Sequence, residues 1–222
     1  MPELFDYKTE KVAHLIRQIC QQRLGEVLVI GCGSGMEAAI LAQQLGAHVV
    51  GIDVEDAFDP EARTIAELRV GDAASLDFAD SSFDFVYSYH TLEHIHQPMP
   101  ALQEMRRVLR DGGAFWIGTP NRHRLLGYLG SKTATTKEKI WWNFVDWKMR
   151  LQGRFHNEHG AHAGFSVMEL QSMLQQVFSH VKEMTNAYYE EIYHTRLGLV
   201  KALEFTRLSH ILFPAIYFAG RK

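Results

Sequence analysis

The chain has 222 residues, 46% of them hydrophobic and 22% charged, and carries a formal net charge of −3. These values fit a single globular domain over 1–222 and disfavour a general affinity for nucleic acid. The two cysteines, Cys20 and Cys32, are too few to staple a chain of this length, and the charged start has no secretory pattern. The most apolar run, 211–220, is too short to span a bilayer. We therefore expect a cytoplasmic protein.

Strands that alternate with helices are predicted over the first half of the chain. Apolar residues at helical spacing indicate helices within 4–24, 36–45 and 99–109, and Gly46 is well placed to end the second of them. Short apolar runs that end in glycine or a polar residue indicate strands over 27–30, 48–52, 67–70, 83–88 and 114–118. This alternation is typical of βαβ units. The expected fold class is α/β, a doubly wound, mostly parallel sheet with helices on both faces.

The part of the chain after residue 121 is less regular. Between Arg122 and Arg154 there are eight Lys and Arg residues against two acids, and three of the four tryptophans lie in the same span. We expect residues 122–165 to form an insertion over the substrate side of the sheet. Beyond it, Ser166 and Glu169 predict a capped helix over 166–178. The pattern then predicts a strand over 180–188, a helix over 197–212 and a closing strand over 215–219.

The stretch VLVIGCGSG, residues 27–35, joins a predicted strand to a predicted helix and has glycine at alternate positions. This spacing indicates that something comes close to the backbone. A dinucleotide fingerprint would have its third glycine where Met36 stands, and Glu37 in the first helical turn would repel a pyrophosphate. A phosphate-free adenosine ligand fits better, with its ribose on Asp53 and its adenine amino group on Asp72. An NAD-dependent oxidoreductase stays open as an alternative.

Five segments follow one another in a recognisable order. They are VLVIGCGSG (27–35), VVGIDV (49–54), GDAASLDF (71–78), SSFDFVYSYHTLEHI (81–95) and ALQEMRRVLRDGGAFWIGTPN (101–121). Together, with a weaker likeness over 162–174, they resemble the class I S-adenosylmethionine-dependent methyltransferases of the small-molecule, type 11-like kind. The resemblance implies a Rossmann-like sheet of seven strands with the last one antiparallel. It also implies methyl transfer from S-adenosylmethionine to a small molecule, leaving S-adenosylhomocysteine.

The same resemblance assigns cofactor contacts to the loops that follow the strands. It puts Gly31, Cys32 and Gly33 against the methionine part and the ribose, Asp53 on the ribose hydroxyls, Asp72 and Ala73 beside the adenine, and Tyr89 and His90 near the sulfonium. The family usually has an acid two residues before the first glycine, and this chain has Val29 there. Either another group does that job, or cofactor binding is weaker than usual. Val29 also supports an alternative, a non-catalytic module that binds S-adenosylmethionine and acts by association.

Histidines are the candidates for the general base that a hydroxyl acceptor would need. His90 follows the fourth predicted strand, and His162 precedes a helix expected to face the site, so these two are the catalytic candidates. His94 is interpreted as a packing residue beneath the cofactor.

The spacing of His156, His159 and His162 raises the question of a metal site. Gly160 and Gly164 would break any helix that brought these rings to one face, and no cysteine is near. We therefore expect no metal.

Four apolar residues, Ile140, Phe144, Trp147 and Leu151, fall on one face of a helix predicted within 137–151. The simplest interpretation is that this face packs over the sheet edge or closes the active site as a lid. A second is an interfacial helix that makes a peripheral membrane contact and admits an amphiphilic acceptor. A third is recognition of an anionic soluble partner. The sequence predicts neither the methyl acceptor nor the oligomeric state.

Overall fold

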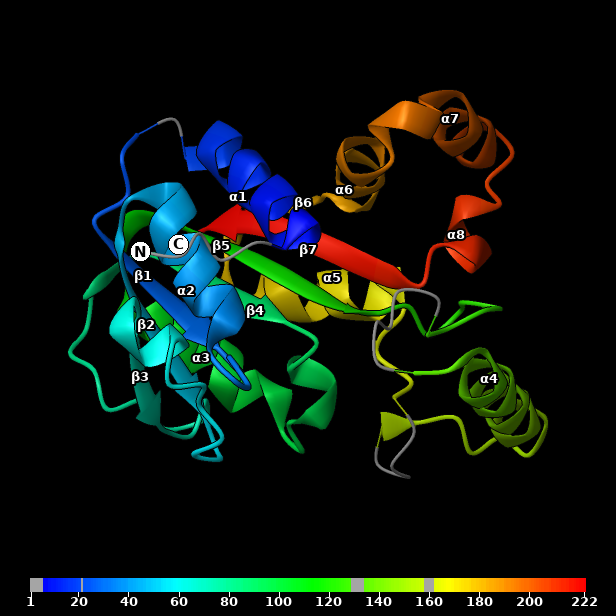
Figure 1. Ribbon diagram of the computed structural model, residues 1–222, viewed down its shortest axis with the longest axis horizontal. Coiled ribbons are helices and arrows are strands. Elements are labelled where there is room, and N and C mark those ends of the chain that lie inside the picture. The colour runs from blue at the N-terminus through cyan, green and yellow to red at the C-terminus, as the bar shows by residue number, and fades with distance from the viewer. Residues whose placement is uncertain (1–5, 21, 129–133, 158–161) are drawn as a thin grey trace.

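A seven-stranded sheet forms the centre of the molecule, in the order β3-β2-β1-β4-β5-β7-β6 (Figure 1). The computed structural model describes residues 6–20, 22–128, 134–157 and 162–222. The strands are β1 Glu26–Ile30, β2 His48–Asp53, β3 Glu67–Val70, β4 Phe83–Tyr89, β5 Leu109–Pro120, β6 Ser179–Glu183 and β7 Ala215–Arg221. The first five strands pair in parallel, and β7 runs antiparallel to both of its neighbours. The predicted fold class is confirmed, including the antiparallel last strand.

Helices cover both faces of this sheet. On one face lie α1 Tyr7–Cys20, α2 Met36–Leu45, α6 Thr185–Ile192 and α7 Leu197–Phe205, and on the other lie α3 Pro98–Val108 and α5 Val167–Val177. Two further helices, α4 Thr136–Leu151 and α8 Ser209–Leu212, stand beyond the end of the sheet (Figure 1). Alternate side chains of each strand enter opposite core clusters, as with Leu28 and Val29 of β1. Both faces are therefore apolar.

Local sequence signals fix most element ends. Capping boxes at Thr135 and Ser166 begin α4 and α5, and Gly46, with φ 61°, ends α2 as predicted. Residues 111–113, between the predicted helix and the predicted strand, form an irregularity inside β5, where Gly112 has φ 75° and the pairing with β4 shifts register. The chain thus passes from α3 directly into β5.

The strand predicted over 180–188 is wrong in its second half, because β6 ends at Glu183 and α6 begins at Thr185. Tyr188, Tyr189 and Ile192 lie at helical spacing and are buried in the core cluster beneath α1. The helix predicted over 197–212 is divided into α7 and α8, with Arg207 between them at φ 59°.

The orientation of α4 also differs from the simplest expectation. Its buried residues are polar, Asn143 and Asp146, whereas Ile140, Phe144 and Leu151 are 66%, 54% and 91% exposed. The apolar face therefore does not pack over the sheet. The physical reason is that the segment before α4 offers buried polar groups, which only the polar face of this helix can satisfy.

The polar face of α4 makes an ion pair and hydrogen bonds to the segment that precedes the helix. Arg124 donates to Asp146 at 3.1 Å, and both side chains are almost fully buried. Asn143 accepts from the Gly127 amide at 2.7 Å and donates to the Gly127 carbonyl at 3.1 Å. Trp147 donates its indole N–H to the backbone and stays 44% exposed. Among the described residues, α4 is held by these hydrogen bonds and by the Arg124–Asp146 ion pair.

Candidate cofactor and acceptor site

The loop after β1 uses its backbone amides internally. The amides of Gly31 and Cys32 both donate to the carbonyl of Ile52, at 2.9 and 3.0 Å, and that of Gly33 donates to Asp53 Oδ2 at 2.7 Å. A pyrophosphate site at a helix N-terminus needs free amides. Because these three amides are engaged, the loop fits a ligand without phosphates, and the dinucleotide alternative loses support.

The glycines of this loop differ in what a side chain at each position would meet. A Cβ on Gly31, at φ 70°, would lie 2.1 Å from Thr91 Oγ1, and one on Gly35, at φ 83°, would lie 2.2 Å from Leu68 Cδ1. The protein's own side chains therefore make the close approach at these two positions. Gly33 has φ 53° and nothing within 4 Å of its Cβ position. The space over Gly33 is where a ligand can lie against the backbone.

Two residues predicted to bind the adenosine lie at the ends of neighbouring strands. Asp53 ends β2, and besides Gly33 it accepts at Oδ1 from the amide of Glu55 at 3.3 Å. Its carboxylate keeps acceptor capacity for a ribose diol. After β3, exposed Asp72 accepts from a local amide, and Ala73 is 7% exposed beneath it. The geometry fits a ribose at Asp53 with an adenine toward Asp72.

Cys32 meets any ligand through its backbone only. Its thiol is buried against β2, since a Cβ on Gly51 would lie 3.0 Å from Sγ. Burial, with Asp53 nearby, raises the pKa of this thiol to about 12. It is a neutral packing group.

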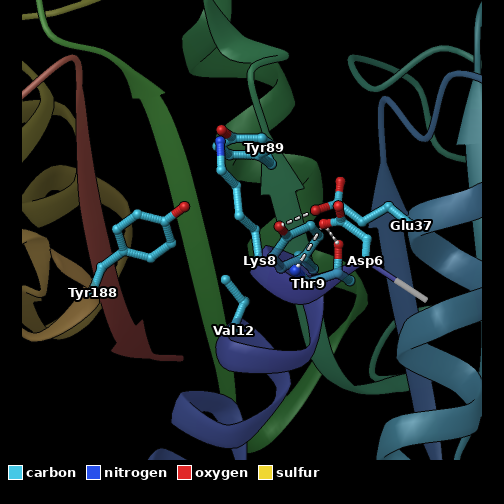
Figure 2. Close-up of a pocket in the computed structure, with 8 residues that line it drawn as sticks. Asp6, Lys8, Thr9, Val12, Glu37, Tyr89 and Tyr188 are labelled. Carbon is cyan, nitrogen blue, oxygen red and sulfur yellow. Dashed lines mark hydrogen bonds between the residues drawn. The ribbon is translucent and has the colours of Figure 1, made fainter. Parts of the chain in front are cut away.

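A cavity of about 250 Å³ lies between α1, α2 and β4 (Figure 2). Glu37 points into it and accepts a hydrogen bond from Tyr87 Oη at 2.6 Å. Asp6 lies beside Glu37, and Lys8 extends toward Tyr89 (Figure 2). Burial raises the pKa of Glu37 to about 7, and the charge of Asp6 acts in the same direction. The sequence analysis placed Glu37 where a pyrophosphate would have to lie and so argued against a phosphate there, whereas its side chain is turned toward Tyr87 of β4.

A second cavity, of about 990 Å³, shares Lys8, Tyr89 and Tyr188 with the first. Arg124 and Trp142 border it on the α4 side, but half of its wall comes from α6 to α8, with aromatic and aliphatic side chains. The sequence analysis expected residues 122–165 to cover the substrate side and did not name α6 to α8 as part of this wall. The available signal was the aromatic run at 188–193, which the strand prediction obscured.

Both candidate bases border the large cavity. His90 has φ 53°, donates its amide to Gly118 at 2.8 Å and packs its ring 4.2 Å from that of Tyr89. Burial, then the charges of Arg124 and His162, lowers the pKa of His90 well below its usual range. The ring is therefore neutral at pH 7, and its affinity for a proton is lower than that of an exposed histidine. His162 lies 4.8 Å from the ring of His94.

Glu93 is a site residue that sequence reasoning missed. Its side chain is fully buried, and neither carboxylate oxygen has a hydrogen bond to any residue that the structure describes. Oε1 lies 3.5 Å from His90 Nδ1 and 4.0 Å from His94 Nε2. Burial raises the pKa of Glu93 to about 7. The signal in the sequence was an acid with histidines three residues before and one residue after it.

Metal-site geometry is absent from the part of the chain that the structure describes, where no group of three His, Cys, Asp or Glu side chains is suitably arranged. His159 lies outside the described residues. Within the same described ranges, every helix is too short or too polar to cross a membrane.

Residues 28–117 match a protein family described as a methyltransferase domain. A probable S-adenosylmethionine-dependent methyltransferase of Mycolicibacterium smegmatis is 35% identical over 100 residues, which cover 44% of this chain and 38% of the relative. An O-methyltransferase of Aspergillus sclerotiorum is 30% identical over 125 residues, which cover 52% of this chain and 47% of the relative. The chain thus aligns with less than half of each relative's length.

Solved structures share the fold at low identity. The phosphoethanolamine N-methyltransferase 2 of Haemonchus contortus, solved with S-adenosyl-L-methionine, has a TM-score of 0.61 at 18% identity over 96% of this chain and 52% of that chain. The [4+2]-cyclase SpnF has a TM-score of 0.59 at 18% identity over 96% of this chain and 81% of that chain. The region of family similarity contains the glycine loop and the ends of β2, β3 and β4. Over this region the chain is similar to S-adenosylmethionine-dependent methyltransferases.

Proposed function

We propose that the protein transfers a methyl group from S-adenosylmethionine to a small-molecule acceptor. One observation carries this proposal: a large, mostly apolar cavity reaches Tyr89 and His90, at the end of the strand beside the glycine loop. In an open α/β sheet, ligands bind at the carboxyl ends of the strands. The cavity is therefore where an acceptor can meet a cofactor that lies over the loop.

The cofactor residues proposed are those that the resemblance assigns, and the geometry above is compatible with them. Gly31, Cys32 and Gly33 offer backbone, Asp53 takes the ribose hydroxyls, Asp72 and Ala73 flank the adenine, and Tyr89 borders the reacting end. When bound, S-adenosylmethionine supplies an electrophilic methyl group on its sulfonium. The chain itself must align the acceptor with that carbon, and alignment contributes roughly 7–11 kcal/mol in well-oriented reactions.

His90 is the first candidate for a general base, and His162 the second. His90 Nδ1 faces the buried carboxylate of Glu93, which leaves Nε2 for the acceptor. When His90 takes a proton from an acceptor hydroxyl, the ionised Glu93 stabilises the imidazolium that forms. This division of roles makes His90 the group that touches substrate and Glu93 a positioning residue.

The acceptor proposed is amphiphilic, because the cavity wall is aromatic and aliphatic apart from a few charged groups such as Arg124. The exposed apolar face of α4, which includes Ile140 and Phe144, is flanked by Lys137 and Lys148. A helix of this kind binds an anionic lipid surface with its apolar face in the headgroup region. We propose a peripheral membrane contact through 137–151, beside the cavity that Trp142 of the same helix borders.

Co-sedimentation with vesicles tests this contact. The protein should pellet with phosphatidylcholine vesicles that contain phosphatidylserine, at low salt, and less with phosphatidylcholine alone. Replacing Ile140 and Phe144 by Ser should abolish pelleting. Met168→Ser is the matched control, because Met168 is 82% exposed on a different helix. Equal pelleting of all variants, or none of the native protein, would remove the proposal.

A non-catalytic module that only binds S-adenosylmethionine would have no enclosed cavity next to the methyl group. The large cavity at His90 counts against it, and Val29 remains its only support. Fold alone does not decide the reaction, since a [4+2]-cyclase has a similar fold.

The proposed location is the cytoplasm. Both cysteines are free and buried, which supports a reducing compartment.

Calorimetric titration is the test of the cofactor. S-adenosylmethionine and S-adenosylhomocysteine should both bind, and Asp53→Ala should weaken both. Glu55→Ala is the matched control, since Glu55 is an exposed acid two residues further on. Acceptors are then screened with a labelled methyl group. Failure of the native protein to bind either compound would refute the proposed function.

A further inference from the structure

We infer that the cavity between α1, α2 and β4 holds the amino-acid end of the cofactor, with Glu37 binding its ammonium group and Lys8 its carboxylate. The inference rests on the proposed function, because it supposes that S-adenosylmethionine is the ligand. It assigns a task to two residues outside the five segments on which the family resemblance stands. It also identifies a group that can take the role of the acid that the family usually has at the position of Val29.

Position is the first argument. Glu37 comes two residues after Gly35, so a ligand that lies over the glycine loop reaches this cavity within one helical turn. The cavity shares Lys8, Tyr89 and Tyr188 with the large cavity proposed for the acceptor. A cofactor whose sulfonium faces Tyr89 therefore has its amino-acid end beside Lys8 and Glu37.

Charge is the second argument. Glu37 and Asp6 both line this small cavity, and Asp6 accepts hydrogen bonds from the amide and hydroxyl of Thr9 at 3.1 and 2.9 Å. Two acids side by side repel each other when both are ionised. A bound ammonium group removes that repulsion and makes charge-assisted hydrogen bonds. The acidic floor of the cavity thus favours a cation.

Lys8 supplies the opposite charge. It lines both cavities, and Figure 2 shows its side chain extended away from Glu37 toward Tyr89. No ion pair joins it to an acid among the residues that the structure describes. A carboxylate bound at Lys8 and an ammonium group bound at Glu37 match the two charged groups of one amino acid, which share a single carbon atom. The cavity therefore fits a zwitterion better than a single cation.

The sheet shows how Glu37 comes to replace an acid on β1. Val29 pairs with Tyr87 across β1 and β4, and both residues face the same core cluster. The Tyr87 hydroxyl donates to Glu37 at 2.6 Å. The carboxylate that starts on α2 is thus held over the sheet face where Val29 lies.

Binding of two ligands tests the inference without a turnover measurement. S-adenosylhomocysteine carries the amino-acid end, whereas 5′-methylthioadenosine keeps the adenosine and thioether but lacks it. Glu37→Gln and Lys8→Met should each weaken S-adenosylhomocysteine binding about 10-fold or more, the loss of a charge-assisted contact. Binding of 5′-methylthioadenosine should change less than about 2-fold. Glu61→Gln, an exposed acid outside both cavities, is the matched control and should change neither.

The outcomes separate this inference from the proposed function. If the variants leave both affinities unchanged, or reduce both equally, the amino-acid end lies elsewhere and the inference is wrong while the cofactor stands. If the native protein binds neither ligand, the proposed function is wrong, and the inference with it. Lys8 is half-buried near the surface, so Lys8→Met decides the matter even where Glu37→Gln disturbs folding.

Discussion

Residues 26–120 and residues 122–157 join the rest of the molecule in different ways. In the first region, strands pair in register and apolar side chains fill both faces of the sheet, so close packing holds the glycine loop in place. In the second, α4 is attached by the Arg124–Asp146 ion pair and by Asn143, and its apolar residues face outward. The first region is therefore fixed by close packing, whereas the second leaves an apolar helix face exposed near the large cavity.

The largest effect on activity should come at His90, where the first region borders the large cavity. His90→Ala should reduce methyl transfer about 10²–10⁴-fold, the usual contribution of a general base, with S-adenosylhomocysteine affinity unchanged. Steady-state kinetics with the acceptor found in the labelled-methyl screen measures this. Glu93→Gln should reduce the rate less and change its pH profile, because it acts through His90. An unchanged rate in His90→Ala would move the role to His162.

Removing the ion pair between Arg124 and Asp146 should loosen α4 from the rest of the molecule. Asp146→Ala leaves the Arg124 charge buried without its acid, which costs about 3–5 kcal/mol when a buried pair is broken. We expect local opening, so hydrogen exchange over 136–151 should speed up while the urea midpoint of the sheet stays nearly constant. Asp146→Asn, which keeps a hydrogen-bond acceptor, should lose less. A fall of the whole molecule's midpoint would contradict the separation of the two regions.

The glycine loop should respond to packing. Gly31→Ala should reduce the free energy of unfolding by about 3 kcal/mol, because its Cβ collides with Thr91 in a left-handed conformation. Gly33→Ala meets no neighbour and should cost about 1 kcal/mol, yet it fills the space proposed for the ligand. Urea unfolding and titration with S-adenosylhomocysteine separate the two effects. Equal stability losses would contradict the different reasons given for the two glycines.

The smallest predicted effect is a pH dependence at Glu37. The groups around it are Asp6 and Lys8 from the N-terminal segment, Tyr87 and Tyr89 from β4, and Tyr188 from α6. Burial keeps the three tyrosines neutral by raising their pKa values. Since burial raises the pKa of Glu37 to about 7, S-adenosylhomocysteine affinity should rise about 10-fold from pH 6 to pH 8. Titrations of the native protein across this range measure the rise.

The free energy of unfolding should fall as pH rises, in the opposite direction to the ligand affinity. The folded protein holds a proton on Glu37 that an unfolded carboxyl, with a pKa of 4.5, releases, so this group's contribution falls as pH rises from 4.5 to 7. Glu37→Gln should therefore gain stability over the native protein above pH 7 and lose the pH dependence of affinity. A gain that is the same at pH 4 and pH 8 would exclude Glu37 as the titrating group.

Much of the first region could be predicted because its signals are local. The loop at Gly31 and Gly33, the strand that ends at Asp53 and the helix end at Gly46 each depend on a few neighbouring residues. Side-chain period and backbone conformation are set over such short distances. The resemblance to a family covered this same part of the chain.

The second region could not be predicted to the same depth. The apolar residues of α4 have the spacing of a core helix, and only the buried Arg124 decides that its polar face turns inward. The pattern at 180–188 predicts a strand, and only the packing against the core shared with α1 decides that Tyr188 lies on a helix. Glu93 gave no sign of burial, because it is a charged residue in a polar segment, within the single 3-10 turn Leu92–His94.

The sequence by itself determined the alternation of strands and helices up to residue 121, the glycine loop and the resemblance to a family, since these follow from local periodicity and turn chemistry. Only the tertiary structure decided that Glu37 lies over Val29 against Tyr87, that Glu93 stands behind His90, and that α6 to α8 wall the acceptor cavity. Burial and opposing charge depend on which segments meet in space. Residues far apart in the chain supply that environment, so no local pattern contains it.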